Sequence, residues 1–145
     1  MNTDIQRFDS PEAAAMSDFP AAHCRVVASA AEGDDGYVLI DANPLEGGYL
    51  YGVNVHRVDG GWEPGTDGNG PGWTVADPER ELGTLVVWGE APKRADRVRV
   101  EWNGETREAA AEEGVYLVAW WRVPPPDEFP GEVAFRVRGE WVWIS

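Results

Sequence analysis

Residues 97–110, RVRVEWNGETREAA, carry the clearest fold signal in this chain. Every second residue from Val98 to Trp102 is apolar and the residues between them are charged, so this segment has one apolar face and one polar face. Asn103 and Gly104 then supply the two positive-φ positions of a type I′ turn, which joins antiparallel strands tightly. The stretch therefore predicts a β-hairpin that turns its apolar side chains toward a core.

The same alternation of short strands and tight turns continues through the second half of the chain. We expect residues 138–140 to form a second tight turn. Six strands are predicted, at residues 84–88, 97–102, 106–110, 115–123, 132–137 and 141–144. Short strands at intervals of about eight to twelve residues are typical of an antiparallel sandwich, and the arrangement resembles an immunoglobulin-like module. That family's Cys–Trp–Cys spacing and tyrosine corner are missing, so the resemblance concerns architecture and implies no activity.

The first half of the chain is predicted to begin with a short helix over residues 10–16. Ser10 is a favourable N-cap and Pro11 suits the first helical position, whereas Pro20 ends the helix. A helix this short is marginal by itself and needs anchoring side chains, for which the candidates are Phe8, Met16 and Phe19. Three strands follow, at residues 24–30, 37–41 and 49–58, and they predict an antiparallel β-meander.

A segment rich in glycine and proline, residues 59–72, follows the last of these strands. Eight of its fourteen residues are Gly or Pro, so we expect an irregular loop, bordered by Trp62 and Trp73. The mainly β chain is therefore divided into an acidic α+β region, 1–82, and a β-sandwich region, 83–145. We expect the two regions to pack as one unit.

The charge of the chain limits its classes of partner. Among 145 residues, 26 are acidic and 12 are basic, which gives a formal net charge of −14. Nucleic acids are bound by basic surfaces, so we expect no nucleic-acid partner. No apolar run approaches the ~18 residues of a membrane span, and residues 1–18 lack the apolar core of a secretion signal. These features predict a cytoplasmic protein without membrane contact.

Nucleophiles and imidazole groups are few. Cys24 is the only cysteine, so no intramolecular disulfide forms, and His23 and His56 are the only histidines. A Cys24–His56 dyad and a metal site on the two histidines are alternatives that no sequence motif supports. We therefore predict neither an enzyme nor a cofactor.

Residues 67–72, DGNGPG, resemble the beginning of a calcium-binding loop. Pro78 stands where an EF-hand has its bidentate glutamate, so the chain has no EF-hand. An irregular Ca²⁺ site on Asp67, Asn69 and Asp77 is the remaining alternative to a solvated loop.

The strand at 115–121 is apolar on both of its alternating faces, and the strand at 141–144 repeats this pattern with Trp141 and Trp143. A two-sheet sandwich buries only one face of each strand. The second face therefore needs a cover, which is either the N-terminal helix and strands or a partner seated on the tryptophans. A homodimer through this tryptophan-rich face is one form of the second alternative.

The acidic charge is concentrated in the first region, because residues 1–82 have a net charge of −11 and residues 83–145 one of −3. We expect a non-catalytic interaction domain whose acidic N-terminal half binds a basic protein. Small acidic inhibitors and immunity proteins have this general character, by analogy only. The alternative is a small-ligand or carbohydrate-binding β-module that uses exposed tryptophan. The candidate binding surface comprises Trp62, Asp67, Asn69, Trp73, Trp120, Trp141 and Trp143.

Overall fold

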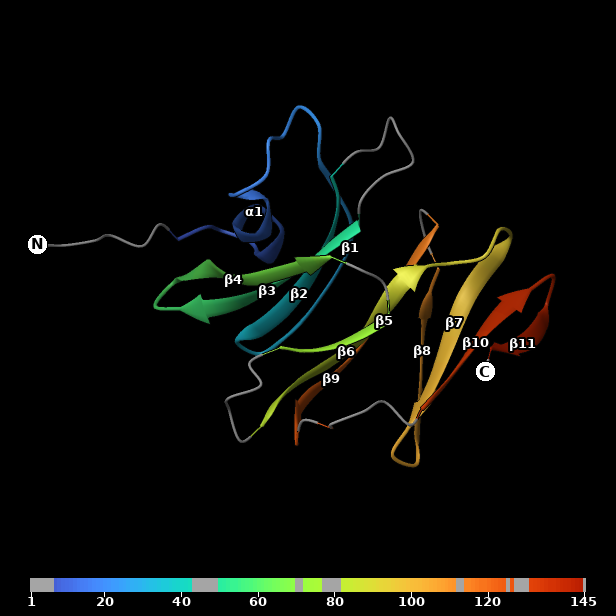
Figure 1. Cartoon of the computed structure of the whole chain (residues 1–145). Helices are drawn as coiled ribbons and strands as arrows, with labels where there is room; N and C mark the ends of the chain where they lie inside the picture. Colours follow the sequence, from blue (N-terminus) through green and yellow to red (C-terminus); the bar gives the residue numbers. More distant parts are fainter. Residues whose placement is uncertain are drawn as a thin grey trace, which may run out of the picture. The chain divides into compact units, whose positions relative to one another are not determined.

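The computed structural model describes residues 7–42, 50–69, 72–76, 82–111, 114–124, 126 and 131–144, with side chains except at 66–69, 72–76 and 144. The chain separates into two compact units, residues 1–70 and 71–145, and each is described by itself (Figure 1). We call them the N-terminal unit and the C-terminal unit. Antiparallel strands dominate both units, which confirms that the chain is mainly β.

One short helix and a four-stranded sheet form the described part of the N-terminal unit (Figure 1). The elements are α1 (Pro11–Met16), β1 (Arg25–Glu32), β2 (Asp35–Asp41), β3 (Leu50–Val58) and β4 (Gly61–Asn69). The strands pair in chain order as an antiparallel meander. The predicted helix and the three predicted strands are confirmed, with shifts of one or two residues at their ends.

Helix α1 packs against one face of this meander. The side chain of Ser10 accepts a hydrogen bond from the backbone N–H of Ala13 at 3.1 Å, so the predicted N-cap forms. Phe8, Met16 and Phe19 pack against the apolar cluster beneath the helix, as predicted for its anchors. The buried members of this cluster are Ala14, Ala15, Cys24, Val38, Ile40, Val53, Val55 and Trp62.

The segment rich in glycine and proline forms strand β4, so the predicted irregular loop is wrong for residues 61–69. Among the named strands, β4 pairs with β3 alone, and such an edge position tolerates Pro64 because one side of the backbone needs no partner. On β4, the N–H of Trp62 donates to the C=O of Phe8 at 2.8 Å, and the C=O of Trp62 accepts from the N–H of Phe8 at 2.9 Å. Strand pairing therefore overrides the low strand propensity of glycine here.

Seven strands in two antiparallel sheets form the described part of the C-terminal unit (Figure 1). They are β5 (Gly72–Ala76), β6 (Gly83–Glu90), β7 (Ala95–Trp102), β8 (Glu105–Ala110), β9 (Val115–Val123), β10 (Glu132–Val137) and β11 (Glu140–Ile144). One sheet has the order β5-β6-β9 and the other the order β11-β10-β7-β8. All six predicted strands are present and β5 is additional, so the expected six-stranded arrangement is corrected to sheets of three and four strands.

The two sheets share one apolar core. Its buried members are Leu85, Val87, Val98, Val100, Trp102, Tyr116, Val118, Trp120 and Phe135. Trp102 and Trp120 meet edge to face with their ring centroids 5.6 Å apart. Burial among these residues raises the pKa of the Tyr116 hydroxyl. The alternation predicted for 97–102 is confirmed, since Val98 is fully buried whereas Arg99 is only partly buried.

Two tight turns fix the hairpins of the larger sheet. Asn103 and Gly104 have φ angles of +53° and +79°, and Arg138 and Gly139 have φ angles of +54° and +79°. Positive φ at both central residues is the signature of the type I′ turn that the Asn-Gly pair predicted. Both hairpins therefore have the register of a two-residue connection.

Strand β9 is buried on both of its faces, as its sequence predicted. Every residue from Val115 to Trp120 is at most 9% exposed. Tyr116, Val118 and Trp120 belong to the core between the two sheets, and the alternate residues are buried on the opposite face. This second face is therefore withdrawn from solvent.

Substitution of Gly52 tests how closely the N-terminal sheet is packed. A Cβ at this position would lie 2.6 Å from Cε2 of the buried Tyr37 and closer still to its hydroxyl. We expect Gly52→Ala to lower the free energy of unfolding by about 1–3 kcal/mol, measured by urea titration, because the core must be overpacked. Gly60→Ala has open space and costs only about 1 kcal/mol through its positive φ. Wild-type stability of Gly52→Ala would show that the sheet relaxes around this contact.

Candidate binding surfaces

Two of the tryptophans predicted for the binding surface are core residues. Trp62 is 7% exposed in the cluster beneath α1, and Trp120 is 1% exposed between the two sheets of the C-terminal unit. The indole N–H of Trp120 donates to Oε2 of Glu105 at 3.0 Å, which satisfies its polar atom. These two predictions are corrected, because both rings are buried by packing within their own units.

Asp67, Asn69 and Trp73 lie on strands rather than in a loop. Asp67 and Asn69 are in register with β3, and Trp73 on β5 is in register with β6. Their side chains lie outside the described residues, as does all of Asp77. A binding surface on these residues stays a prediction and a Ca²⁺ site stays an alternative, but the irregular loop expected at residues 67 and 69 is a strand.

Trp141 and Trp143 lie on the outer face of the β11-β10-β7-β8 sheet, which is the face turned away from the shared core. Trp141 is opposite Arg136 and Trp143 is opposite Ala134 in the register of β10 and β11. The guanidinium of Arg99 lies 4.0 Å from the centroid of the Trp141 ring, within cation–π range. Trp141 is half-buried, whereas Trp143 is 44% exposed. Of the predicted tryptophans with described side chains, these two reach the surface.

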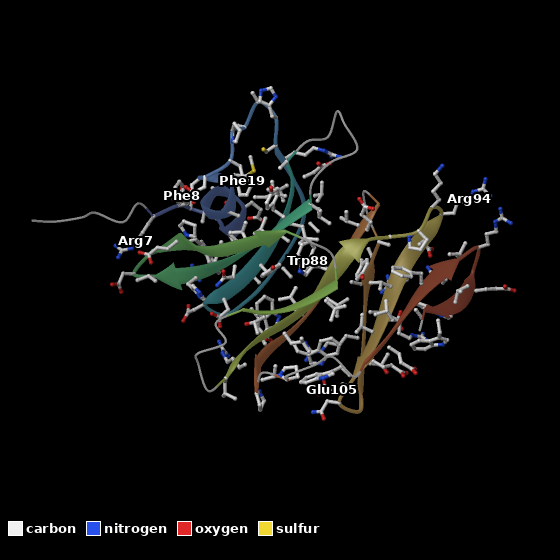
Figure 2. The ribbon with its side chains drawn as sticks, viewed as in Figure 1. Arg7, Phe8, Phe19, Trp88, Arg94 and Glu105 are labelled. Atoms are coloured by element: carbon white, nitrogen blue, oxygen red, sulfur yellow. The ribbon has the colours of Figure 1, made fainter. Side chains whose placement is uncertain are left out.

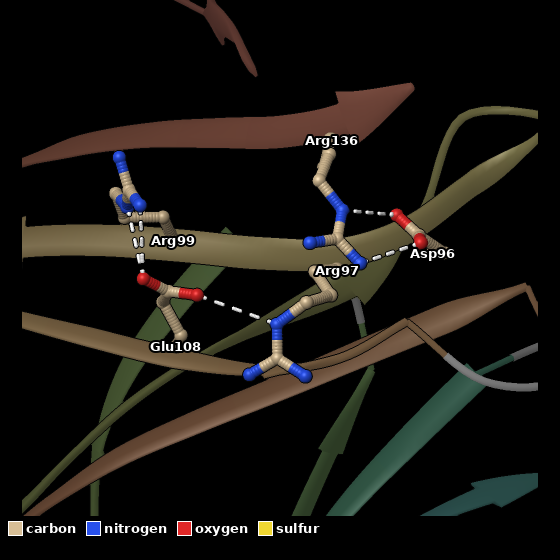
Figure 3. A network of polar contacts seen from close by, with 5 residues as sticks. All are labelled: Asp96, Arg97, Arg99, Glu108 and Arg136. Atoms are coloured by element: carbon tan, nitrogen blue, oxygen red, sulfur yellow. Dashed lines mark hydrogen bonds and ion pairs between the residues drawn. The ribbon is translucent and has the colours of Figure 1, made fainter. Parts of the chain in front are cut away.

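Three arginines on the same outer face are paired with two carboxylates (Figure 3). Nε and Nη2 of Arg136 donate to the two oxygens of Asp96 at 3.0 and 2.7 Å. Arg99 donates to Oε2 of Glu108 at 3.2 and 3.0 Å, and Arg97 donates to Oε1 at 3.3 Å. The Arg136–Asp96 pair has the planar, two-pronged geometry of a bidentate ion pair, and Glu108 links Arg97 with Arg99. Together these contacts connect β8, β7 and β10.

These ion pairs shift the carboxylates toward their charged forms. Hydrogen bonds from Arg136 lower the pKa of Asp96, and hydrogen bonds from Arg99 lower the pKa of Glu108. In return, the contact with Asp96 raises the pKa of Arg136. Each of these three arginines is therefore paired with a carboxylate within the sheet, and none of them is a free cationic site.

A cavity of about 350 Å³ lies at the end of the C-terminal unit that carries the β7–β8 turn. Its lining residues are Glu101, Trp102, Asn103, Gly104, Glu105, Thr106, Gly131 and Glu132, of which Glu105 is labelled in Figure 2. Glu101 on β7 is directly opposite Glu132 on β10, and two like charges in such a pair repel each other. The cavity is therefore suited to a cationic group.

A row of titratable side chains crosses the sheet of the N-terminal unit on the face opposite α1. The register places one residue of the row on each strand in turn, Glu32, Asp35, His56 and Glu63. Nδ1 of His56 lies 3.1 Å from Oδ1 of Asp35, and Nε2 lies 3.2 Å from Nδ2 of Asn54. Arg7 approaches Glu63 at 3.4 Å. Both ring nitrogens of the histidine therefore have partners, and the row is predominantly acidic.

The Cys24–His56 dyad, an alternative that no sequence motif supported, does not form. Cys24 is buried in the cluster beneath α1, where its thiol lies 3.7 Å from the carbonyl oxygen of Ala42. His56 follows Val55 of that cluster by one residue and so points to the opposite face of the sheet. In the described part of the chain, no group of three or more His, Cys, Asp or Glu side chains is placed to hold a metal ion.

Sequence reasoning missed the partners of the outer-face arginines. The alternation of residues 97–102 placed Arg97 and Arg99 on the solvent-exposed face of their strand. The sequence does not show which strands lie beside this strand. Asp96 and Arg136 are 40 positions apart, so no local spacing connects them. The alternation of charges along β7 and β8 is the only signal that pointed to this face.

Acidification tests the pair of Asp96 with Arg136. The pKa of Asp96 is lowered below 3.8 in the folded state, so the pair stabilises the fold at neutral pH and this contribution is lost as the pH falls through the folded-state pKa. We expect Asp96→Asn to melt at a slightly lower temperature than wild type at neutral pH, measured by circular dichroism. The gap between the two proteins should close below about pH 4. A gap that is equal at every pH would contradict an ionic contribution.

No helix in the described ranges is long and apolar enough to cross a membrane. Comparisons with protein-family models, with curated proteins and with solved structures found no match to this chain.

Proposed function

We propose that this chain is a non-catalytic interaction domain whose acidic N-terminal half binds a basic protein. The observation that carries the proposal is an acidic end of the N-terminal sheet, formed by two neighbouring hairpin turns. Residues 1–70 contain 12 acidic and 3 basic side chains, a net charge of −9. This unit therefore holds most of the negative charge of the chain.

The acidic end is built by the meander topology. In an antiparallel meander alternate turns lie at the same end of the sheet, so the β1–β2 turn lies near the β3–β4 turn. Glu32, Asp34 and Asp59 are exposed on these two turns. The guanidinium of Arg57, at the same end, lies 5.8 Å from the centroid of the Trp62 ring. Most of the charged side chains exposed at this end of the sheet are therefore carboxylates.

The negative charge of this acidic end attracts a positively charged partner before the two proteins are in contact. A concentrated negative potential raises the rate at which a positively charged surface arrives and orients it on approach. At 0.1 M ionic strength, salt screens the electrostatic field of an exposed carboxylate over a distance of about 10 Å. Binding through this surface therefore weakens as the salt concentration rises.

We also propose that the C-terminal unit is an immunoglobulin-like module. Its sheet orders, β5-β6-β9 and β11-β10-β7-β8, correspond to A-B-E and G-F-C-C′ when β8 is lettered C′, because it pairs with β7 (C), and the other strands take the letters A, B, C, E, F and G in chain order. Variable-type immunoglobulin domains likewise extend their G-F-C sheet by strand C′. Many cell-surface domains share this sandwich as a scaffold, which supports an interaction role by analogy.

Carbohydrate binding is a second candidate because Trp143 is 44% exposed beside Trp141. An exposed indole offers a flat apolar platform with a polar edge. The burial of Trp62 and Trp120 removes two other tryptophans from this candidate. A change in tryptophan fluorescence on titration with glycans would favour it over the acidic interaction.

A pull-down at two salt concentrations tests the acidic interaction. The immobilised chain should retain a basic protein from a lysate of its source organism at low salt and release it at high salt. Asp34→Asn combined with Asp59→Asn should weaken the recovered complex about tenfold, which corresponds to about 1.4 kcal/mol. Titration calorimetry with the recovered partner measures this change.

The matched control removes the same charge from the C-terminal unit. Glu90→Gln combined with Glu140→Gln changes two exposed carboxylates outside the acidic end, and we expect it to leave affinity nearly unchanged. Equal weakening by both double variants would show that net charge, and not this surface, governs binding. Retention that is independent of salt would exclude the proposed mechanism.

A further inference from the structure

We propose that strand β11 is a self-association edge, at which two copies of the chain join their β11-β10-β7-β8 sheets across a two-fold axis at Val142. This inference goes beyond the binding of a basic partner, because it concerns the other unit and a second copy of the same chain.

The two edges of this sheet differ in their protection. Edge strand β8 carries Glu105, Arg107 and Glu108, and charged side chains discourage pairing with another chain. Edge strand β11 has the sequence EWVWI, with no proline or lysine and with its only charge at the first residue. Val142 is 52% exposed and Trp143 is 44% exposed on this edge. One edge is therefore protected against pairing and the other is open to it.

The hairpin turn determines which backbone groups of β11 face outward. A two-residue turn makes its flanking residues, Val137 and Glu140, a hydrogen-bonded pair, and bonded pairs then alternate along the ladder. Val142 is therefore bonded to β10, whereas the N–H and C=O groups of Trp141 and Trp143 point away from the sheet. These are the groups that a further antiparallel strand would engage.

A two-fold axis at Val142 satisfies these groups in one register. It places Trp141 of one copy opposite Trp143 of the other, twice, so each strand uses all of its outward groups and gains cross-strand aromatic pairs. Val142 then faces Val142 of the second copy at the axis. A partner strand of different sequence would not repeat this match on both sides, so the self-complementary pattern favours a second copy.

Charge on the outer face favours the same antiparallel arrangement. Glu101 and Glu132 lie at the end of the sheet where β11 finishes, and Arg97 and Arg136 lie toward the end where β11 begins. Joining β11 to β11 in antiparallel fashion places the acidic end of one sheet away from the acidic end of the other, beside arginines that are already paired with Asp96 and Glu108. The orientation is therefore favoured because the two acidic ends do not repel each other.

Sedimentation of the full chain tests the association. Two paired five-residue strands form a contact smaller than a standard interface, so we expect a weak dimer with a concentration-dependent mass between 15.9 kDa and twice that value. A chain that remains monomeric at every concentration would overturn the proposal. The same result is expected if β11 pairs with a strand of a different protein.

Charges introduced at Val142 test the position of the axis. Val142→Lys and Val142→Glu should each weaken self-association more than about tenfold, because two like charges then meet at the axis. An equimolar mixture of the two variants should regain the dimer, since lysine then faces glutamate. The side chain is exposed in the single chain, so both variants should keep the wild-type melting temperature.

The same substitutions on the protected edge provide the control. Ala110 is exposed on β8, and Ala110→Lys and Ala110→Glu should dimerise like wild type, alone or mixed. Loss of the dimer in the Val142 variants without recovery on mixing would overturn the two-fold register at this residue. A dimer insensitive to every Val142 variant would overturn the use of β11.

Discussion

Two type I′ turns determine the register of the β7–β8 and β10–β11 hairpins, and the outer face of the β11-β10-β7-β8 sheet depends on that register. Sliding either hairpin by one residue would exchange the core face and the solvent face of a whole strand. In the observed register Val98 and Val100 fill the core, while Arg99 stands between Glu108 and Trp141 on the outside. The pairing of Glu108 with Arg97 and Arg99 and the outward groups of the β11 edge are consequences of these turns. The Asp96–Arg136 ion pair and the Arg99–Trp141 contact also require the long-range pairing of β7 with β10.

The two units differ in how their charged side chains are arranged. In the C-terminal unit, Arg97, Arg99 and Arg136 are paired with carboxylates on adjacent strands, so most of their charge is compensated locally. In the N-terminal unit, Asp34 and Asp59 are placed on exposed turns and few cations accompany them. On our two proposals, the acidic end of the N-terminal sheet attracts a basic partner from a distance, whereas the β11 edge recognises a strand of matching register. The two proposals are compatible in one chain of net charge −14, because they concern different units.

Most of the strands could be predicted because alternation and turn dipeptides are local properties. Asn103-Gly104 is enough to place a hairpin, and the register then follows. Strand β4 could not be predicted, since its glycines and Pro64 are tolerated only because β3 and Phe8 supply hydrogen bonds from outside the segment. The binding surface was predicted less well, because a tryptophan such as Trp120 is equally suited to a core or an interface, and tertiary packing decides between them.

An open strand edge is ordinarily an aggregation hazard, since each added strand presents a new edge for the next. The sheet described here limits that growth, because its far edge is the charged strand β8. Once two copies join at β11, both open edges are used and only protected edges remain. The proposed association therefore closes at two copies, as isologous two-fold contacts do. On this proposal, the difference between the two edges of one sheet leads to a dimer and not to open-ended aggregation.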